Sequence, residues 1–239
     1  MFRRICILFL VGLLPSLVQA QTLRIAVASN FAVPLQKLIG HYRETYPCAP
    51  GISVSIGSTG KLYAQIRQGA PFDLFFAADA ERPKRLVEAG LTLGTEEIYT
   101  VGRLALWHPK SSRPSELTTR LQGSARIAMA NPKLAPYGLA AQQTRSALGW
   151  QQRASAQLVT LENVGQTWAS VASGNANTGF VALSQVRQQD LPDNTFTLVP
   201  ETLHDPITQA AVILQSTSQP EDAKLFLAFV QSVSGHTTP

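Results

Sequence analysis

The chain has 239 residues, of which 45% are hydrophobic, with 20 Lys and Arg against 15 Asp and Glu and a formal net charge of +5. The positive excess is mild and spread along the sequence, without a basic cluster or interleaved aromatic residues, so the composition gives no support to nucleic-acid binding. This length can bury a substantial core and lies between one large domain and two small ones.

The first 20 residues have the pattern of a signal peptide. Met1–Arg4 is basic, residues 5–18 form an apolar run interrupted by Gly and Pro, and Val18–Ala20 has the small-x-small pattern of a cleavage site. The run is too short and too interrupted for a membrane span. We therefore expect cleavage after Ala20 and export of a soluble protein to the periplasm, with the net charge reduced to +3 by loss of two arginines.

The first predicted unit is a strand followed by a helix, with small polar residues between them. Residues 23–28 predict the strand, and residues 34–46 predict a helix with one apolar face. Ser29 and Asn30 lie where the strand ends and the helix opens.

The second unit has the same design and is the most informative stretch of the chain. Residues 52–56 alternate apolar with small polar side chains, as a half-buried strand does, and Gly57–Gly60 turns into a helix. Such a turn directs the Ser58 and Thr59 hydroxyls and the first free backbone N–H groups at one point, which suits an anion. An ordinary N-cap before a surface helix explains the same residues equally well, so both interpretations stay open.

A pair of acidic residues follows around the next strand. Residues 72–77 form a continuous apolar run, typical of a strand buried on both faces. Asp79 is expected to cap a helix that reaches Ala89 and stops at Gly90. Strand-end bonding of Asp73 and capping by Asp79 explain these carboxylates without a catalytic role.

The second half of the chain repeats the strand–helix pattern. Residues 99–107 form an extended segment long enough to cross between two lobes, and residues 125–130 form a strand. The prolines before Tyr137 restrict the backbone, so we expect Tyr137 to be held at the start of a helix that ends at Gly149. Further elements follow: a strand at 157–160, a helix from 162 to 173, strands at 179–184, 195–199 and 207–214, and an amphipathic helix at 221–233.

This alternation predicts an α/β protein with mostly parallel sheets. Several predicted helix N-termini carry small polar groups, and they fall in two separated halves of the chain. In open α/β sheets ligands bind beyond the carboxyl ends of the strands, where these N-termini point. Two lobes that face each other across such a cleft would hold an anion between them.

Five ordered blocks resemble the family of periplasmic molybdate-binding proteins of ABC transporters, and they span nearly the whole mature chain. The blocks are residues 26–31, 57–75, 130–138, 162–164 and 179–184. The resemblance implies a two-lobed type II periplasmic binding protein fold with the ligand cleft between the lobes. It also implies two crossover segments, which we place near 99–107 and 194–203. The expected division is a signal peptide at 1–20, lobe I at 21–101 plus 204–239, and lobe II at 102–203.

The resemblance also implies a set of oxyanion ligands. Ser29 would contribute its hydroxyl and backbone N–H, with Asn30 beside it. The second turn would contribute the hydroxyl and amide of Thr59 or, because the register is uncertain by one residue, of Ser58. Val164 would donate its backbone N–H from the opposite lobe.

At one pair of positions the sequence departs from a branch of the family. That branch has a tyrosine where this chain has Ala182, and a small residue where this chain has Tyr137. Another branch has the present combination of Asn30 and Tyr137. We therefore expect Tyr137 to supply a phenolic donor from the other wall of the cleft, whereas a packed loop aromatic is the alternative.

The implied function is binding of molybdate, and of tungstate, for delivery to an ABC transporter permease in the inner membrane. We expect a monomer without a cofactor, in which the molybdenum is held as its oxyanion and no side chain ligates the metal. Uncharged donors cannot accept a hydrogen bond from a protonated anion, so fully ionised molybdate would be preferred to protonated phosphate. Sulfate would be excluded by cavity size alone.

Three other functions are alternatives. A binding protein of the same fold for another oxyanion, such as sulfate, or for a small acid is the nearest alternative. An exported hydrolase is less favoured, because the 57–60 turn is not a Gly-x-Ser-x-Gly elbow and the four histidines lie outside the blocks. A zinc or iron site would need clustered ligands that the sequence lacks. Cys48, alone once Cys6 leaves with the signal peptide, has no disulfide or metal partner in the mature chain.

Overall fold

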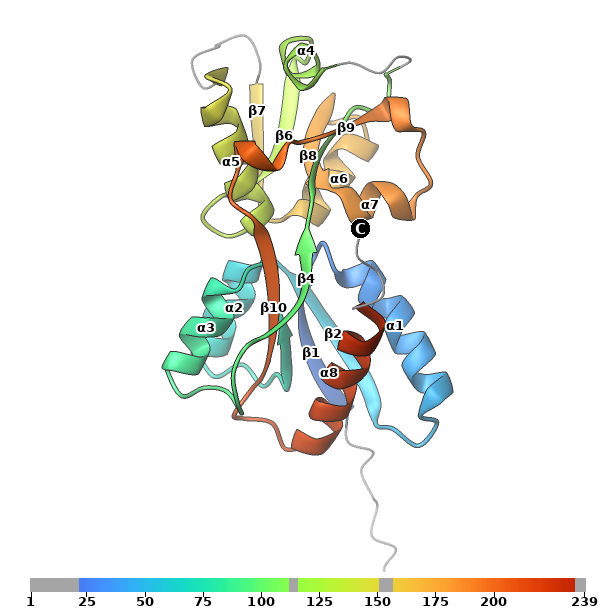
Figure 1. The fold of residues 1–239 in the computed structure, drawn as a ribbon, viewed down its shortest axis with the longest axis vertical. Coiled ribbons are helices and arrows are strands. Elements are labelled where there is room, and N and C mark those ends of the chain that lie inside the picture. Colours follow the sequence, from blue (N-terminus) through green and yellow to red (C-terminus); the bar gives the residue numbers. More distant parts are fainter. Residues whose placement is uncertain (1–21, 112–115, 151–156, 235–239) are drawn as a thin grey trace, which may run out of the picture.

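The computed structural model describes residues 22–111, 116–150 and 157–234, which form two five-stranded sheets with helices packed on their faces (Figure 1). The strand order is β2-β1-β3-β10-β4 in the first sheet and β7-β6-β8-β5-β9 in the second. The predicted signal peptide lies outside the described residues. Among the described residues, no helix has the length and apolar character needed to cross a membrane.

The first sheet and its helices come from the two ends of the described chain. Its strands are β1 (Thr22–Ala28), β2 (Gly51–Gly57), β3 (Leu74–Phe76), β4 (Glu97–Gly102) and β10 (Ile207–Ile213). Its helices are α1 (Ala32–Thr45), α2 (Thr59–Arg67), α3 (Glu81–Glu88) and α8 (Pro220–Ser234).

The second sheet is built from the middle of the chain. Its strands are β5 (Leu104–Trp107), β6 (Arg126–Ala130), β7 (Gln157–Leu161), β8 (Thr178–Ala182) and β9 (Phe196–Leu198). Its helices are α4 (Leu117–Gln122), α5 (Pro136–Ala147), α6 (Val164–Ala172) and α7 (Leu183–Gln188). Short 3-10 turns at Asp193–Thr195 and Glu201–Leu203 flank β9.

Each sheet has one strand that runs against the other four. In the first sheet β1 is parallel to β2 and β3, while β10 is antiparallel to both of its neighbours, β3 and β4. In the second sheet β6 is parallel to β7 and β8, while β5 is antiparallel to β8 and β9. The reversed strands are those that have just crossed from the other sheet, as Figure 1 shows for β10. A crossing chain enters at the carboxyl ends of the parallel strands and therefore runs in the opposite direction.

The predicted α/β class with two lobes and mostly parallel sheets is confirmed. The apolar face of the predicted helix at 34–46 is also confirmed, because Leu35, Leu38, Ile39 and Tyr42 of α1 are buried. These residues share one apolar core with β1, β3 and α8, and a separate core under α5 joins the second lobe to Ala28, Ala78 and Ile207 of the first.

The differences from prediction are local. The extended segment 99–107 is two strands, separated at Arg103, because its halves belong to different sheets. The return crossing lies between β9 and β10, later than the predicted 194–203, because residues 196–198 still pair with β5. The predicted strand 179–184 ends at Ala182, where α7 opens. The helices α4 and α7, of six residues each, are too short to show a helical period and were not predicted.

Candidate anion-binding site

All six residues predicted to bind the ligand line one small pocket between the two sheets, called here the central pocket. Ser29 and Asn30 follow β1, Ser58 and Thr59 begin α2, Tyr137 is the second residue of α5, and Val164 is the first residue of α6. The other lining residues are Ala28, Gly57, Ala78, Ala135, Pro136 and Asn163. None of the lining residues carries a charge, so the described pocket is polar and electrically neutral.

Two hydroxyl groups of the pocket accept hydrogen bonds from backbone N–H groups. Gly165 donates its backbone N–H to Ser29 Oγ at 3.1 Å, across the two lobes. Ala78 donates its backbone N–H to Thr59 Oγ1 at 3.0 Å within the first lobe. A hydroxyl has one proton, and an N–H partner can only donate, so both side chains keep their own proton free to donate.

The other two hydroxyls follow the same rule. Ser58 Oγ caps α2 by accepting from the Lys61 backbone N–H at 3.4 Å. The Tyr137 hydroxyl oxygen accepts from Gln209 Nε2 at 3.3 Å. Thus the capping role of Ser58 and a donor role toward the pocket are compatible, since capping uses the oxygen and leaves the proton.

Backbone amides add further donors at the same place. In the described part of the chain, no hydrogen bond uses the N–H groups of Asn30, Thr59 and Val164. The last two are the first amides of α2 and α6, where the positive end of the helix dipole also favours an anion. The expectation that Ser29 contributes its backbone N–H is wrong, because that group donates to the Gly57 carbonyl at 3.0 Å. The available amide of this turn belongs to Asn30.

Burial raises the pKa of the phenol in the pocket, so its protonated donor form persists even above the ordinary range. The Tyr137 side chain is buried, which raises the pKa of its hydroxyl well above the ordinary value, while the hydrogen bond from Gln209 acts in the opposite direction. The hydroxyl therefore stays protonated through the physiological range. Ala182, the position that distinguishes the two family branches, is buried in the same apolar cluster as Tyr137 and does not line the pocket.

The two lobes touch around the pocket. Gly60 donates its backbone N–H to the Leu134 carbonyl at 2.8 Å, and a side-chain carbon on Gly60 would lie 3.0 Å from the Leu134 backbone. Lys61 Nζ lies 3.0 Å from Glu162 Oε2, and this hydrogen bond is the main reason that the pKa of Glu162 is lowered. These contacts join the start of α2 to the loops before α5 and α6.

The carboxylates singled out in the sequence have structural roles, as expected. Asp73 accepts the backbone N–H of Arg24 at 2.7 Å, and Asp79 accepts that of Arg82 at 3.0 Å at the start of α3. Cys48 is exposed, and the described residues contain no group of three His, Cys, Asp or Glu side chains able to hold a metal ion.

Sequence reasoning missed two residues. Asn163 lines the pocket and caps α6 by accepting the Gln166 backbone N–H at 3.0 Å, and its place in the first turn of the predicted helix was the signal. Gln209 lies behind Tyr137 and Asn30, and its only signal was an amide inside an apolar strand.

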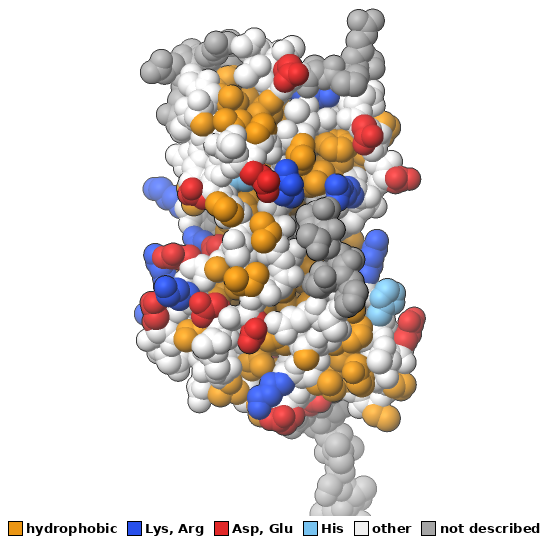
Figure 2. Space-filling model, viewed as in Figure 1, with side chains coloured by type: hydrophobic (Ala, Val, Ile, Leu, Met, Phe, Trp, Pro, Cys, Tyr) orange, Lys and Arg blue, Asp and Glu red, His pale blue; other side chains and the backbone are white. Residues whose placement is uncertain are grey.

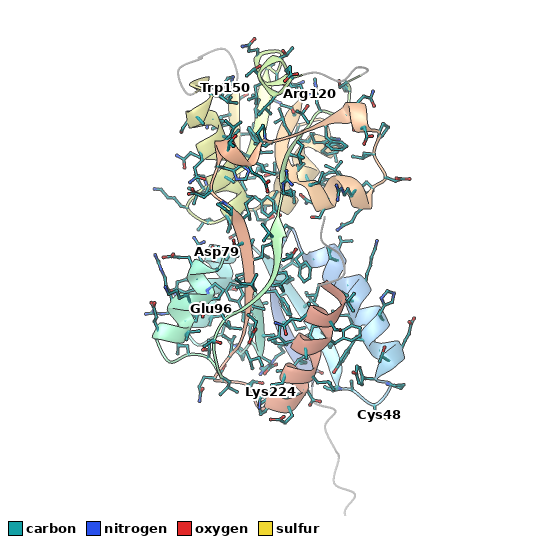
Figure 3. The ribbon with its side chains drawn as sticks, in the orientation of Figure 1. Cys48, Asp79, Glu96, Arg120, Trp150 and Lys224 are labelled. Atoms are coloured by element: carbon teal, nitrogen blue, oxygen red, sulfur yellow. The ribbon has the colours of Figure 1, made fainter. Side chains whose placement is uncertain are left out.

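A second and larger cavity, called here the side groove, has a volume of about 470 Å³. Residues from α3 and the loop before it, from α5, and from the start of β10 and the loop before it line the groove, including Asp79, Arg82, Arg85, Gln143 and Asp205. Figure 3 shows Asp79 at the level where the lobes meet.

The comparisons with known proteins agree along the whole described chain. The family of bacterial extracellular solute-binding proteins matches residues 23–238. The chain is 36% identical over 209 residues to the molybdate-binding protein ModA of Rhodobacter capsulatus, covering 87% of this chain and 81% of that protein. It is 39% identical over 207 residues to the molybdate-binding protein ModA of Azotobacter vinelandii, covering 85% and 81%.

Solved structures give the same result. The periplasmic molybdate-binding protein of Azotobacter vinelandii matches with a TM-score of 0.83 and 33% identity, over 91% of this chain and 99% of that chain. The sulfate-binding protein SubI of Mycobacterium tuberculosis H37Rv matches with a TM-score of 0.71 and 11% identity, over 89% and 82%, which is a likeness of fold alone.

Proposed function

Since the chain belongs to the bacterial extracellular solute-binding proteins, we propose that it binds molybdate in the central pocket and delivers it to an ABC transporter. The family consists of solute-binding proteins and not of enzymes. The ligand is bound as an intact oxyanion by Ser29, Asn30, Ser58, Thr59, Tyr137 and Val164, and it serves as cargo, not as a cofactor.

A single observation carries the proposal. All four hydroxyls that line the pocket accept a hydrogen bond from an N–H group, so each keeps its own proton to donate to a ligand. The backbone N–H groups of Asn30, Thr59 and Val164 are further donors, and a backbone N–H cannot accept. Such a pocket matches a ligand that carries acceptors and no hydrogen, which is the chemistry of a fully ionised tetrahedral oxyanion.

The same donor set explains selectivity. A protonated phosphate brings a hydrogen that needs an acceptor, and no carboxylate, the strongest acceptor for it, lines the pocket. Tungstate has the same charge and nearly the same size as molybdate, so it binds as well. Sulfate is also fully ionised and is discriminated by its smaller size.

The affinity expected from neutral donors is sufficient for a transport receptor. Hydrogen bonds to a charged group contribute roughly 1.5–3 kcal/mol each, so seven such donors supply roughly 10–20 kcal/mol. Association costs at least about 4 kcal/mol. A net −8 to −12 kcal/mol, roughly micromolar to nanomolar affinity, is therefore within reach without a salt bridge to the ligand.

We propose lobe boundaries close to the two crossings, with lobe I at 21–101 plus 204–239 and lobe II at 102–203, although Gly102 still pairs with Ile207 in the first sheet. The lobes close over the anion, and the closed form of the monomer is recognised by an inner-membrane permease. Residues 1–20 act as a cleaved signal peptide, so this exchange takes place in the periplasm.

Calorimetry tests the proposal. Refolded and dialysed protein is titrated with molybdate, tungstate, sulfate, phosphate and chromate. We expect tight binding of molybdate and tungstate and much weaker binding of the other anions. Sulfate bound more tightly than molybdate would assign the protein to the nearest alternative, a receptor for a smaller oxyanion.

A further inference from the structure

Gln209 is a buried polar side chain in the strand that crosses into the first lobe. It is the third residue of β10, its exposed fraction is 2%, and its neighbours in that strand are mostly apolar. It does not line the central pocket, and neither the family resemblance nor the sequence pattern gave it a role.

The carboxamide of Gln209 connects two proposed ligand residues from different lobes. Its Oε1 accepts from Asn30 Nδ2 at 2.8 Å and from the Tyr99 hydroxyl at 3.0 Å. Its Nε2 donates to the Tyr137 hydroxyl oxygen at 3.3 Å. With Asn30 holding Oε1, the Nε2 side of the amide faces Tyr137.

The orientation of this amide decides what Tyr137 can do. When Nε2 faces the phenol, the phenol oxygen accepts, and its single proton remains available to the pocket. If Oε1 faced the phenol, that proton would be consumed by Gln209 and the pocket would lose a donor. The same rotation would also remove the acceptor that orients Asn30.

Gly102, at the end of β4, gives independent evidence that this position is built for the two side chains. A side-chain carbon on Gly102 would lie 2.2 Å from the Tyr137 hydroxyl oxygen and 2.7 Å from Gln209 Nε2. Both distances are far inside van der Waals contact, so the hydrogen-bonded pair packs directly on the glycine backbone. Only glycine leaves room for the pair.

We propose that Gln209 is a positioning residue for oxyanion binding, which holds Asn30 and directs the free proton of Tyr137 into the pocket. The inference rests on the proposed function and adds to it a residue that does not touch the ligand. A neutral amide is suited to this role because it both donates and accepts, and it brings no charge near a dianion.

Glutamate is the most informative replacement. The carboxylate of Gln209→Glu has no hydrogen to give, so it would accept the Tyr137 proton and place a negative charge beside the anion. Protonation of the introduced carboxyl would remove the charge and restore a donor. The titratable groups that face this position are Tyr99 and Tyr137, and the charge of Asp79 acts on Tyr99.

The experiment measures molybdate affinity by calorimetry for the wild type, Gln209→Met, Gln209→Glu and a matched control, Gln219→Met. Gln219 is also a buried glutamine, 5% exposed, and it donates to the Thr22 carbonyl at 3.2 Å, in the first lobe but outside the pocket. Circular dichroism and thermal unfolding check that each variant is folded.

We expect Gln209→Met to bind molybdate about tenfold to hundredfold more weakly. A loss of this size corresponds to one charge-assisted hydrogen bond. Gln209→Glu should bind at least about hundredfold more weakly near pH 8 and recover part of this loss near pH 5.5, whereas the wild type should show no such recovery. Gln219→Met should stay within about threefold of the wild type, even if its stability falls.

A double variant separates positioning from general packing. In a Tyr137→Phe background, Gln209→Met should cost less affinity than it does in the wild type. Part of the effect of Gln209 depends on the Tyr137 hydroxyl, which this background lacks. Full additivity, or wild-type affinity of Gln209→Met, would overturn the inference while leaving the proposed function intact. A wild-type protein that binds neither molybdate nor tungstate would overturn both.

Discussion

The central pocket and the side groove lie near the same junction between the lobes. They differ in whether their polar groups still have unused hydrogen-bond donors. The side groove is the larger cavity and carries most of the charge, with Asp79, Glu81, Arg82 and Arg85 among its lining residues. The central pocket is small and uncharged. Figure 2 shows acidic and basic side chains interspersed over one face of the molecule, as is typical of mutually paired surface charges.

The groups of the side groove are bound to one another. Arg82 pairs with Asp79, Arg85 Nη2 lies 2.6 Å from Glu81 Oε1, and Gln143 Nε2 lies 2.6 Å from Asp205 Oδ2. In the central pocket the four hydroxyl groups take part in hydrogen bonds only through their oxygens, and their protons stay available. A candidate site is therefore better recognised by its unused donors than by its volume or its charge.

The largest effect is expected from a negative charge placed in the central pocket. At an effective dielectric constant of about 20, two unit charges about 4 Å apart repel by about 4 kcal/mol. Ser29→Asp should therefore weaken molybdate binding at least about 1,000-fold, measured by calorimetry. Ser29→Asn has the same size without the charge and should lose much less. Leu139→Asp, on an exposed residue of the side groove, should bind normally.

The second effect tests the donor role of one hydroxyl. Thr59→Val keeps the shape of the side chain and removes its proton and its oxygen. Molybdate affinity should fall by roughly 1.5–3 kcal/mol, and the free energy of unfolding should fall by about 1–3 kcal/mol because the buried Ala78 N–H loses its acceptor. Thr59→Ser should restore most of both. A stability loss with unchanged affinity would show that Thr59 serves the fold alone.

The sequence predicted the pocket's wall better than its supports. The family resemblance implied Ser29, Asn30, Ser58, Thr59, Tyr137 and Val164, and all of them follow strands or begin helices. The order of strands and helices brings such positions to one edge of each sheet. Gln209 could not be found in this way, because its partners depend on how β10 crosses between sheets and lies against β4. Long-range pairing of this kind leaves no periodic signal.

The sequence also could not predict the partners of individual hydrogen-bonding groups. The backbone N–H of Ser29 was expected to face the ligand. The parallel pairing of β1 with β2 continues one residue beyond the strand, so this N–H donates to the Gly57 carbonyl. The choice between Ser58 and Thr59 stays open, because both hydroxyls line the pocket with a proton to donate.

A third test uses the buried phenols beside the central pocket. Burial raises the pKa of Tyr99 and Tyr137 above the ordinary value of 10.0, so the fold favours the protonated forms. This contribution is complete below pH 10, where the unfolded side chains are also protonated, and it is lost as the pH rises further. The loss is about 1.4 kcal/mol per pH unit for each group.

Urea unfolding between about pH 9 and pH 11 measures this loss. Tyr137→Phe should lose stability with pH less steeply than the wild type, by about one such increment per unit above pH 10. Tyr63→Phe, at a half-buried position in α2, is the control and should follow the wild type. Parallel curves for the wild type and Tyr137→Phe would show that the phenol titrates near its ordinary pKa and is accessible to water.

The smallest effect concerns an ion pair that joins the two lobes. Lys61 and Glu162 pair across the lobes at 3.0 Å, but their side chains are 53% and 28% exposed, so solvent screens the attraction. Exposed pairs contribute about 0.2–1 kcal/mol. Lys61→Ala should therefore weaken molybdate binding by no more than about fivefold, and the difference from the wild type should shrink at high salt.

Arg85→Ala is the matched control, because Arg85 and Glu81 pair within α3 and do not join the lobes. Equal losses in both variants would mean that the two charges act through the overall field of the protein. A loss confined to Lys61→Ala, and reduced by salt, would show that contacts between the lobes contribute to closure independently of the hydroxyl and amide donors.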